Sequence, residues 1–450
     1  MLAEAYWDNH FGQADTTIPA VRFQYRPSPA MGKLLIKNAK VLVGTHPVGV
    51  THVAGEAMGV LPQLENGWLY AEDGRIVELG AGVPPATYNE TSTVIVDAAG
   101  GYVLPGWCDP HTHTVFAASR EGEFVDRING LSYQEIAAKG GGIINSAMRL
   151  RAMPEDELYN LAKARLETMM RQGSVAVEIK SGYGLDVDSE LKMLRIVKRL
   201  KAALPLQIKA TLLAAHAIPP EFKENRTGYL DLIVNTIIPQ VAKEGLAEFV
   251  DCFCETNYFT VPEMERVLAA GAEHGLVGKV HVNQFTSIGG IQAALMRGAQ
   301  SVDHLEVMEP ADITALAEAH AAQVHPIYPT LLPSCSFFLR IPYGPAREMI
   351  NAGLPVALAT DFNPGTTPSG NMNLVVSLAC IQLRMLPEEA INAATLNAAA
   401  AMSLSGELGS ITVGKRASFI ITKPVPSLAY LPYAFGNDHI HNVIIDGNVI

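Results

Sequence analysis

Short apolar runs alternate with helical patterns through the middle of the chain, and this alternation constrains the fold more than any other feature. The runs are nearly continuous in apolar residues, as expected for strands buried on both faces of a parallel sheet. Eight such candidate strands lie at residues 102–111, 174–182, 206–216, 248–255, 276–284, 299–304, 322–329 and 354–361. Eight strands alternating with helices over about 280 residues predict a (β/α)8 barrel, and a doubly wound open sheet is the alternative.

The segments between the runs have the periodicity and the end signals of helices. In residues 154–173, PEDELYNLAKARLETMMRQG, Pro154 suits the first helical position, acidic residues fill the first turn and Gly173 follows the last. The apolar residues of this segment form one stripe, at Leu158, Leu161, Ala162, Leu166 and Met169. Residues 186–204 and 260–275 follow the same pattern.

The two ends of the chain have a different character. Residues 33–103 consist of short β-rich runs with turn signals between them, and ASFIITK and HNVIIDGNVI near the C-terminus repeat this style. Segments far apart in sequence often meet in one unit, so we expect a small sheet domain of residues 33–103 and 404–450 beside a barrel of residues 104–403. Residues 1–32 are expected to form an N-terminal extension.

Composition narrows the function classes. A formal net charge of −12 argues against general affinity for nucleic acid or anionic lipid, although a small anionic substrate needs only a local positive group. The five cysteines are scattered without a C-x-x-C motif, which favours reduced thiols. The first residues show no signal peptide and no apolar run approaches the roughly 20 residues that span a membrane, so we expect a cytoplasmic protein.

Metal-ligating residue types recur where the candidate strands end, which is where the active groups of a barrel lie. The first strand ends in His111-Thr112-His113, and residues two apart on a strand point the same way, so both imidazoles can face the barrel mouth. Four later strands end in His216, His281, His304 and Asp361. Each residue alone is a weak signal, but together they predict a site for Zn²⁺ or Fe with one position open for water.

The motif GWCDPHTH, with the later strand-end histidines and aspartate, resembles the amidohydrolase superfamily. The resemblance implies a metal-bearing barrel beside a small β-sandwich built from both termini. Within the superfamily the chain is similar to the imidazolonepropionase family over roughly residues 33–450, in DPHTHTVFAASREGEF, EIAAKGGGI, VEIKSGYGLD, LLAAHAIPPEF, DCFCE, VDHLE and ALATDFNPGTTP.

This similarity implies a homodimeric enzyme of histidine degradation that opens the ring of 4-imidazolone-5-propanoate to give N-formimidoyl-L-glutamate. The alternative within enzymes is a deaminase of a heterocyclic base. A barrel without catalysis that serves as an assembly surface is a third possibility, which the complete ligand set disfavours.

The resemblance also implies roles for individual residues. The metal ligands would be His111, His113, His281 and Asp361. The substrate contacts would be Arg120, Tyr183, His216, Asn363, Gly365 and Thr366. Residue chemistry agrees, because a guanidinium binds a propanoate carboxylate through two parallel hydrogen bonds. The alternatives are an arginine that pins a loop, a packing tyrosine and, at NPGTT, a plain strand-to-helix turn.

Lys180 bears on the number of metal ions. Relatives that bridge two metals use a modified lysine on the fourth barrel strand, but EFVDCFCE has no lysine and Lys180 lies on the second candidate strand. We therefore expect one metal ion, with Lys180 in a structural or supporting role. Asp109 is expected to support a ligand, and Thr112 is expected to point away from the mouth into packing.

Gln284 bears on the reaction. Many single-metal relatives, deaminases especially, carry Glu three residues after the fifth-strand histidine, where this chain has Gln284. An amide cannot act as a general base, but it can hydrogen-bond a ring N–H or C=O, which favours ring hydrolysis over deamination. Asp361 is then expected to take the proton from the attacking water, and His304 to orient that water or stabilise the developing charge.

Overall fold

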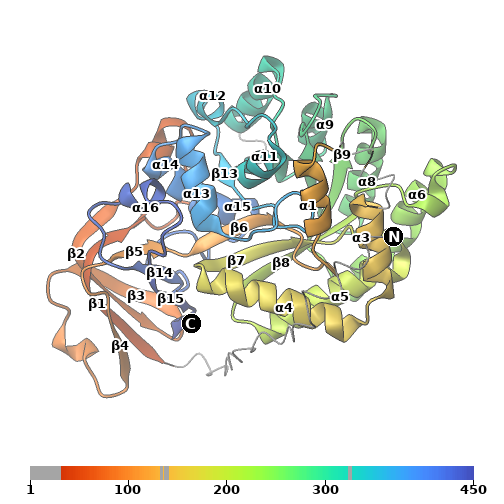
Figure 1. The fold of residues 1–450 in the computed structure, drawn as a ribbon. Coiled ribbons are helices and arrows are strands. Elements are labelled where there is room, and N and C mark those ends of the chain that lie inside the picture. Colours follow the sequence, from red (N-terminus) through yellow and green to blue (C-terminus); the bar gives the residue numbers. More distant parts are fainter. Residues whose placement is uncertain (1–31, 132–134, 136–140, 323–326) are drawn as a thin grey trace, which may run out of the picture.

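The structure, a computed structural model, describes residues 32–131, 135, 141–322 and 327–450. It contains two sheets of eight strands each, one inside a ring of helices and one at the side of the molecule (Figure 1). The expected N-terminal extension lies outside the described residues, apart from Gly32.

The first sheet is a parallel barrel. Its strands are β6 (Trp107–Thr112), β7 (Ser174–Lys180), β8 (Gln207–Ala215), β9 (Phe249–Cys254), β10 (Val277–Val282), β11 (Ser301–His304), β12 (Tyr328–Leu331) and β13 (Ala357–Leu358). They pair in sequence order, and a parallel bridge between Thr112 and Phe362 joins the last segment to the first. This closure confirms the barrel and excludes the open doubly wound sheet.

Helices α1 to α15 follow the barrel strands and surround the barrel, whereas α16 follows a strand of the second sheet, β14 (Phe419–Thr422). They are α1 (Glu121–Ile128), α3 (Gly142–Ala152), α4 (Glu155–Arg171), α5 (Val187–Ala203), α6 (Arg226–Leu232), α7 (Ile238–Glu244), α8 (Val261–Glu273), α9 (Gly290–Met296), α10 (Pro310–Ala321), α11 (Pro333–Leu339), α12 (Ala346–Asn351), α13 (Met372–Ile381), α14 (Pro387–Ala394), α15 (Leu396–Ala401) and α16 (Tyr430–Tyr433). Local signals set their starts: Thr260 and Glu263 form a capping box on α8. Pro154 directly precedes α4 as its cap, one position earlier than the sequence predicts.

The second sheet is built from both ends of the chain. Its strands are β1 (Lys33–Val43), β2 (Gln63–Glu72), β3 (Arg75–Ala81), β4 (Thr93–Asp97), β5 (Tyr102–Pro105), β14 (Phe419–Thr422), β15 (Ile440–Ile445) and β16 (Asn448–Val449). Antiparallel pairing of β5 with β14 joins the two ends. Buried Leu34, Ile36, Phe419 and Ile444 belong to one apolar cluster on this sheet. The predicted limits of the two domains remain a prediction.

Three candidate strands differ from the observed ones. The run 102–111 forms two strands, because the chain leaves the outer sheet after Pro105 and enters the barrel at Trp107. Gly106 makes this crossing close to β7: a Cβ there would lie 2.2 Å from a side-chain carbon of Val175. The seventh run is observed as Tyr328–Leu331 and the eighth only as Ala357–Leu358.

Among the described residues, no helix combines the length and apolar character needed to cross a membrane.

We predict that Gly101→Ala weakens the joint between the two chain ends. A Cβ at Gly101 would lie 1.9 Å from the carbonyl oxygen of Thr422, so β5 and β14 would have to separate. The free energy of unfolding should fall by about 1–3 kcal/mol, measured by urea denaturation. Gly406→Ala is the matched control, because a Cβ at Gly406 meets no atom within 4 Å. Equal unfolding midpoints for the two variants would contradict the prediction.

Candidate metal centre and active site

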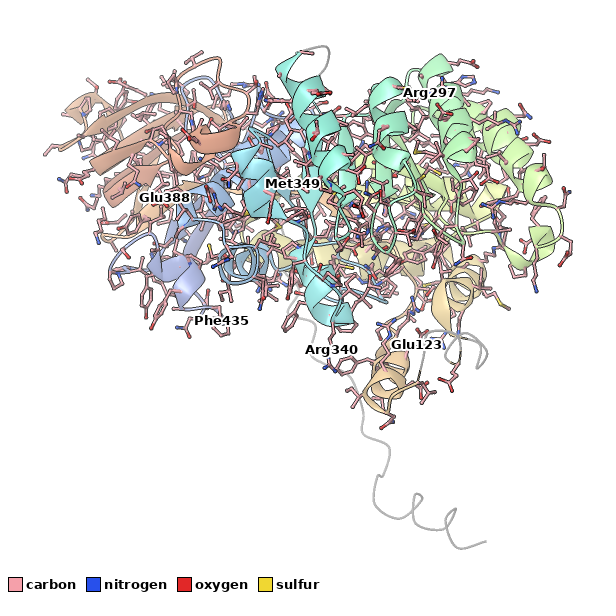
Figure 2. All side chains as sticks on the ribbon, turned by 90° about the horizontal axis from the view of Figure 1, so that it is seen from above. Glu123, Arg297, Arg340, Met349, Glu388 and Phe435 are labelled. Carbon is pink, nitrogen blue, oxygen red and sulfur yellow. The ribbon has the colours of Figure 1, made fainter. Side chains whose placement is uncertain are left out.

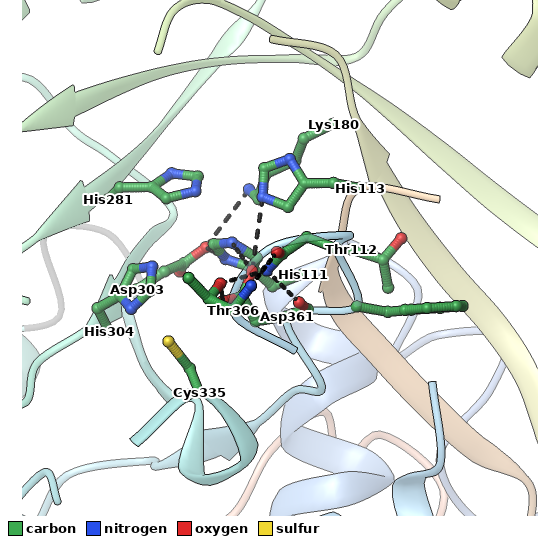
Figure 3. Close-up of polar contacts among 12 residues, drawn as sticks. His111, Thr112, His113, Lys180, His281, Asp303, His304, Cys335, Asp361 and Thr366 are labelled. Carbon is green, nitrogen blue, oxygen red and sulfur yellow. Dashed lines mark hydrogen bonds and ion pairs between the residues drawn. The ribbon is translucent and has the colours of Figure 1, made fainter. Parts of the chain in front are cut away.

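Four histidines and one aspartate meet at the carboxyl ends of the barrel strands (Figure 3). His111, His281 and His304 lie at or near the ends of β6, β10 and β11, and each offers a ligand atom within 4.8 Å of the other two. His111, His113 and Asp361 form a second group by the same criterion. Asp361 Oδ1 lies 3.6 Å from Nε2 of both His111 and His113. All five side chains are buried.

The protonation and pairing of these histidines fit a metal ion. Burial holds the pKa of His111 and of His113 well below the ordinary value, so both rings are neutral, the form that ligates metals. Nε2 of His111, Nε2 of His281 and Nδ1 of His113 are buried and have no hydrogen-bond partner in the described part of the chain. Unpaired buried nitrogens are costly, and a shared cation would satisfy Nε2 of His111 and Nε2 of His281. His113 turns Nε2 toward Asp361, so its unpaired Nδ1 lies on another side of the ring.

Two buried carboxylates orient His111 and His281 through hydrogen bonds to Nδ1, the nitrogen that faces away from the centre. Nδ1 of His111 lies 2.7 Å from Asp303 Oδ2, and Nδ1 of His281 lies 2.9 Å from Asp251 Oδ2. A carboxylate accepts the Nδ1 proton of each ring, so Nε2 carries the lone pair that faces the centre. Neither aspartate was predicted from the sequence, because the only signal of each is a charged residue inside a buried strand.

Lys180 supports these carboxylates from the floor of the barrel. Its Nζ lies 2.8 Å from Asp251, 3.4 Å from Asp303 and 2.6 Å from Glu178, and all four side chains are fully buried. Burial lowers the pKa of Lys180, but the three carboxylates outweigh it and leave the pKa above the ordinary value. Lys279 forms a further ion pair with Glu178.

Asp109 acts on Asp361 through the backbone. Its carboxylate accepts from the backbone N–H and the hydroxyl of Thr360, at 3.0 and 2.6 Å. Burial raises the pKa of Asp109 to about 7, although these hydrogen bonds oppose the shift. Thr112 donates to the carbonyl of Glu178 at 2.6 Å and turns away from the mouth.

Two of the central residues have left-handed backbone conformations. Asp361 has φ +57° and His304 has φ +89°, values that side chains with a Cβ seldom adopt. The backbone N–H of Asp361 donates to the carbonyl of His111 at 3.0 Å, in the closure of the barrel. The surrounding hydrogen bonds therefore hold strained conformations where the functional side chains need a fixed direction.

A cavity of about 440 Å³ opens over the centre. Its walls include the predicted site residues His113, Arg120, Tyr183, His216, His281, Gln284, His304, Asp361, Asn363 and Thr366. The sequence analysis missed other wall residues, among them Arg127, Phe253, Tyr258 and Arg340. Gly365 lies behind Arg120, where a Cβ would come within 2.2 Å of the guanidinium. This glycine leaves space for the arginine.

Arg120 caps the start of helix α1 and lines the cavity, and Glu123 lies in the first turn of that helix. Arg120 forms an ion pair with Glu123. The ring of Phe124 stacks on that of Phe338 from α11, with centroids 5.5 Å apart, and Figure 2 shows Glu123 and Arg340 on this side of the molecule. Direct binding of a substrate carboxylate by Arg120 remains a prediction.

His216 keeps one ring nitrogen available to a ligand, whereas the side-chain oxygen of Asn363 accepts hydrogen bonds within its own turn. His216 Nδ1 lies 3.0 Å from the carbonyl of Gly182, and burial lowers the pKa of His216 to about 3. Because a carbonyl only accepts, Nδ1 carries the proton and Nε2 is left as an acceptor. Asn363 instead accepts from the backbone of Gly365 and Thr366 at 2.8 and 2.7 Å. NPGTT is thus a turn pinned by Asn363, and its contact with substrate stays a prediction.

Cys335 is a further neighbour that the sequence analysis did not single out. It lies on α11, and its sulfur accepts a hydrogen bond from Gln284 Nε2 at 3.4 Å. The same sulfur lies within 4.8 Å of one ligand atom each of His304 and Glu306. No motif marks it, because its position depends on how α11 packs over the barrel.

Known proteins resemble this chain along most of its sequence. The model of the amidohydrolase family matches residues 102–450. An imidazolonepropionase of Flavobacterium johnsoniae is 54% identical, covering 92% of this chain and 99% of the relative. One of Christiangramia forsetii is 53% identical, covering 93% and 100%.

Solved structures share the fold at much lower identity. Guanine deaminase of E. coli has a TM-score of 0.71 with 14% identity, covering 93% of this chain and 99% of that one. Guanine deaminase of C. acetobutylicum with bound guanine has a TM-score of 0.67 with 16% identity, covering 93% and 100%. Likeness at this identity shows the architecture alone.

We predict that Asp303→Asn weakens metal binding by roughly 10- to 100-fold, because His111 loses the carboxylate that fixes its tautomer. Metal content would be measured by mass spectrometry after equilibration against graded chelator. Glu389→Gln is the control, since Glu389 is also buried and ion-paired but contacts Arg347 on α12. If Asp303→Asn retained as much metal as the control, the prediction that Asp303 supports metal binding would be wrong.

Proposed function

Because the chain belongs to the amidohydrolase family and, within it, to the imidazolonepropionase family, we propose that this site hydrolyses 4-imidazolone-5-propanoate to N-formimidoyl-L-glutamate. The observation that carries the proposal is one cavity whose walls include Arg120 and the cluster of His113, His281 and Asp361. A guanidinium suits the propanoate of the substrate, and the cluster suits hydrolysis of its ring amide.

The chain's residues would hold one metal ion, Zn or Fe. His111, His113, His281 and Asp361 would be its ligands, and Asp303 and Asp251 would keep two of the rings in the ligating tautomer. When bound, such an ion lowers the pKa of water and polarises a carbonyl. The absence of lysine from β9 (FVDCFC) supports a single ion.

Proton transfer falls to Asp361 in this proposal. Burial raises the pKa of Asp361, and the nearby His304 and His281 offset this only in part. The carboxylate would take a proton from the attacking water as its oxygen bonds to the ring carbonyl carbon. Asp361 would return that proton to the ring nitrogen as the C–N bond breaks. The carboxylic acid formed would then lose the second proton of the water to solvent and become the carboxylate of the product.

His304 and Gln284 would assist without exchanging that proton. Burial lowers the pKa of His304, but the charge and hydrogen bond of Glu306 outweigh it and leave the pKa above the ordinary value. A cationic His304 can orient the water or stabilise the negative charge that develops on the carbonyl oxygen. Gln284 would hydrogen-bond the ring.

The remaining wall residues would position the substrate. Arg120 would bind the propanoate, with space left by Gly365. His216 presents Nε2 as an acceptor for a ring N–H. Tyr183 and the Asn363–Thr366 turn would border the ring.

Deamination of a heterocyclic base is the weaker candidate. The guanine deaminases share only the fold with this chain. Gln284 stands where deaminases use a glutamate, and Arg120 would have no carboxylate to bind. We also propose that the enzyme is a cytoplasmic homodimer without nucleic-acid partners.

We predict that the purified protein accelerates loss of the ring chromophore of freshly generated imidazolonepropanoate. Chelator should abolish the acceleration, and added Zn²⁺ or Fe should restore it, because the ligand set acts only with a metal. Decay no faster than the spontaneous rate would overturn the proposed function. Release of ammonia from guanine would instead support the deaminase.

We predict that Arg120→Gln raises KM for imidazolonepropanoate by about 10- to 150-fold, the equivalent of about 1.5–3 kcal/mol for hydrogen bonds to a charged group. Arg120→Lys should recover part of the loss, since it keeps the charge but not the paired donors. An imidazolone without the propanoate is the matched control.

With that control substrate, kcat/KM should be the same for Arg120→Gln and the parent. Equal losses on the two substrates would show that Arg120 pins its loop and does not bind the carboxylate.

A further inference from the structure

A third group of side chains that could bind a metal ion shares His304 with the first group. His304 ends β11, Glu306 follows two residues later and Cys335 comes from α11, and one ligand atom of each lies within 4.8 Å of the other two. All three residues are buried. Figure 3 shows the sulfur of Cys335 on the side of the site that carries His304. The proposed hydrolysis uses His304, gives Glu306 only an effect on the charge of His304 and gives Cys335 no role.

Glu306 gives an independent sign that this group could bind a cation. Its Oε1 lies 3.3 Å from His304 Nδ1 and accepts from Ser336 Oγ at 3.4 Å, both long contacts for hydrogen bonds. Its Oε2 is buried and has no hydrogen-bond partner in the part of the chain that the structure describes. The side chain of Glu306 is only 1% exposed, so this oxygen is left without compensation from bulk water.

The donor types select the ion. Imidazole nitrogen, carboxylate oxygen and thiolate sulfur together suit Zn²⁺ and its substitutes Co²⁺ and Cd²⁺, whereas Mg²⁺ and Ca²⁺ prefer oxygen alone. Three protein ligands leave a fourth tetrahedral position for water.

We propose that His304, Glu306 and Cys335 form a second site, for a zinc-like divalent cation, whose occupation inhibits the enzyme. An ion there would bind the thiolate in place of the thiol proton, which passes to solvent. It would also replace the contacts of His304 with Glu306 and of Gln284 with Cys335. The inhibitory effect rests on the proposed function, because it follows from the removal of His304 and Gln284 from the reacting ring.

The test starts from the enzyme with one bound metal ion and adds Co²⁺ or Cd²⁺ while thiolate-to-metal charge-transfer absorbance and ring-opening activity are followed together. The first ion should give no thiolate band, because its ligands are histidines and a carboxylate. One further equivalent should produce the band, and activity should fall with the same midpoint.

Two cysteine variants separate this site from other thiols. Cys335→Ala should lose both the band and the inhibition. Cys380→Ala should keep both and keep the basal activity, since Cys380 is half-buried on α13 outside the cavity wall. If Cys335→Ala does not fold, Glu306→Gln should weaken the second ion's apparent affinity by at least about tenfold.

Several results would overturn the proposal: no band at the second equivalent, a band that persists in Cys335→Ala, a band already present with the first ion, or a band without loss of activity. The absorbance measurement needs no turnover. A protein that shows the band but never opens the imidazolone ring would therefore refute the proposed function and leave the cation site standing.

Discussion

The ion pairs of one buried lysine underlie the arrangement of the candidate metal centre. Lys180 lies between Asp251 and Asp303, which would repel each other in a dry interior without its charge. The ammonium balances the charge of both carboxylates, and each accepts the Nδ1 proton of one histidine: Asp251 that of His281 and Asp303 that of His111. These buried ion pairs therefore orient the Nε2 atoms of His111 and His281, the candidate ligand atoms. Removal of one partner from such a buried network typically costs several kcal/mol.

The mouth of the barrel uses a different device. Asp361 and His304 both have left-handed backbone conformations. Three features hold that of Asp361: the closure of the barrel, the hydrogen bonds between Asp109 and Thr360, and the turn held by Asn363. The strained backbone turns each side chain inward at the end of its strand. A fixed charge network at the floor and a fixed backbone at the rim together leave little freedom to the side chains between them, which suits preorganised catalysis.

The parts of this site that could be predicted are those whose position follows from strand periodicity. His111, His281 and His304 lie at strand ends, so the barrel alone brings them together. Asp303 was harder to foresee, because a charged residue in an apolar strand has no distinct pattern until its histidine partner is known. Cys335 could not be predicted at all, since its contact depends on the packing angle of α11. The split of the first run at Gly106 was missed because both halves are equally apolar.

The sheet assembled from both chain ends has a consequence for biosynthesis. Strands β1 to β5 are made first, yet β5 pairs with β14, which follows the entire barrel in the sequence. During translation the early strands therefore keep one edge unpaired until β14 has left the ribosome, and unpaired edges favour association with other chains. Strand β4 follows β1 closely in the sequence and can pair with it early, but the edge of β5 stays unpaired until β14 is made.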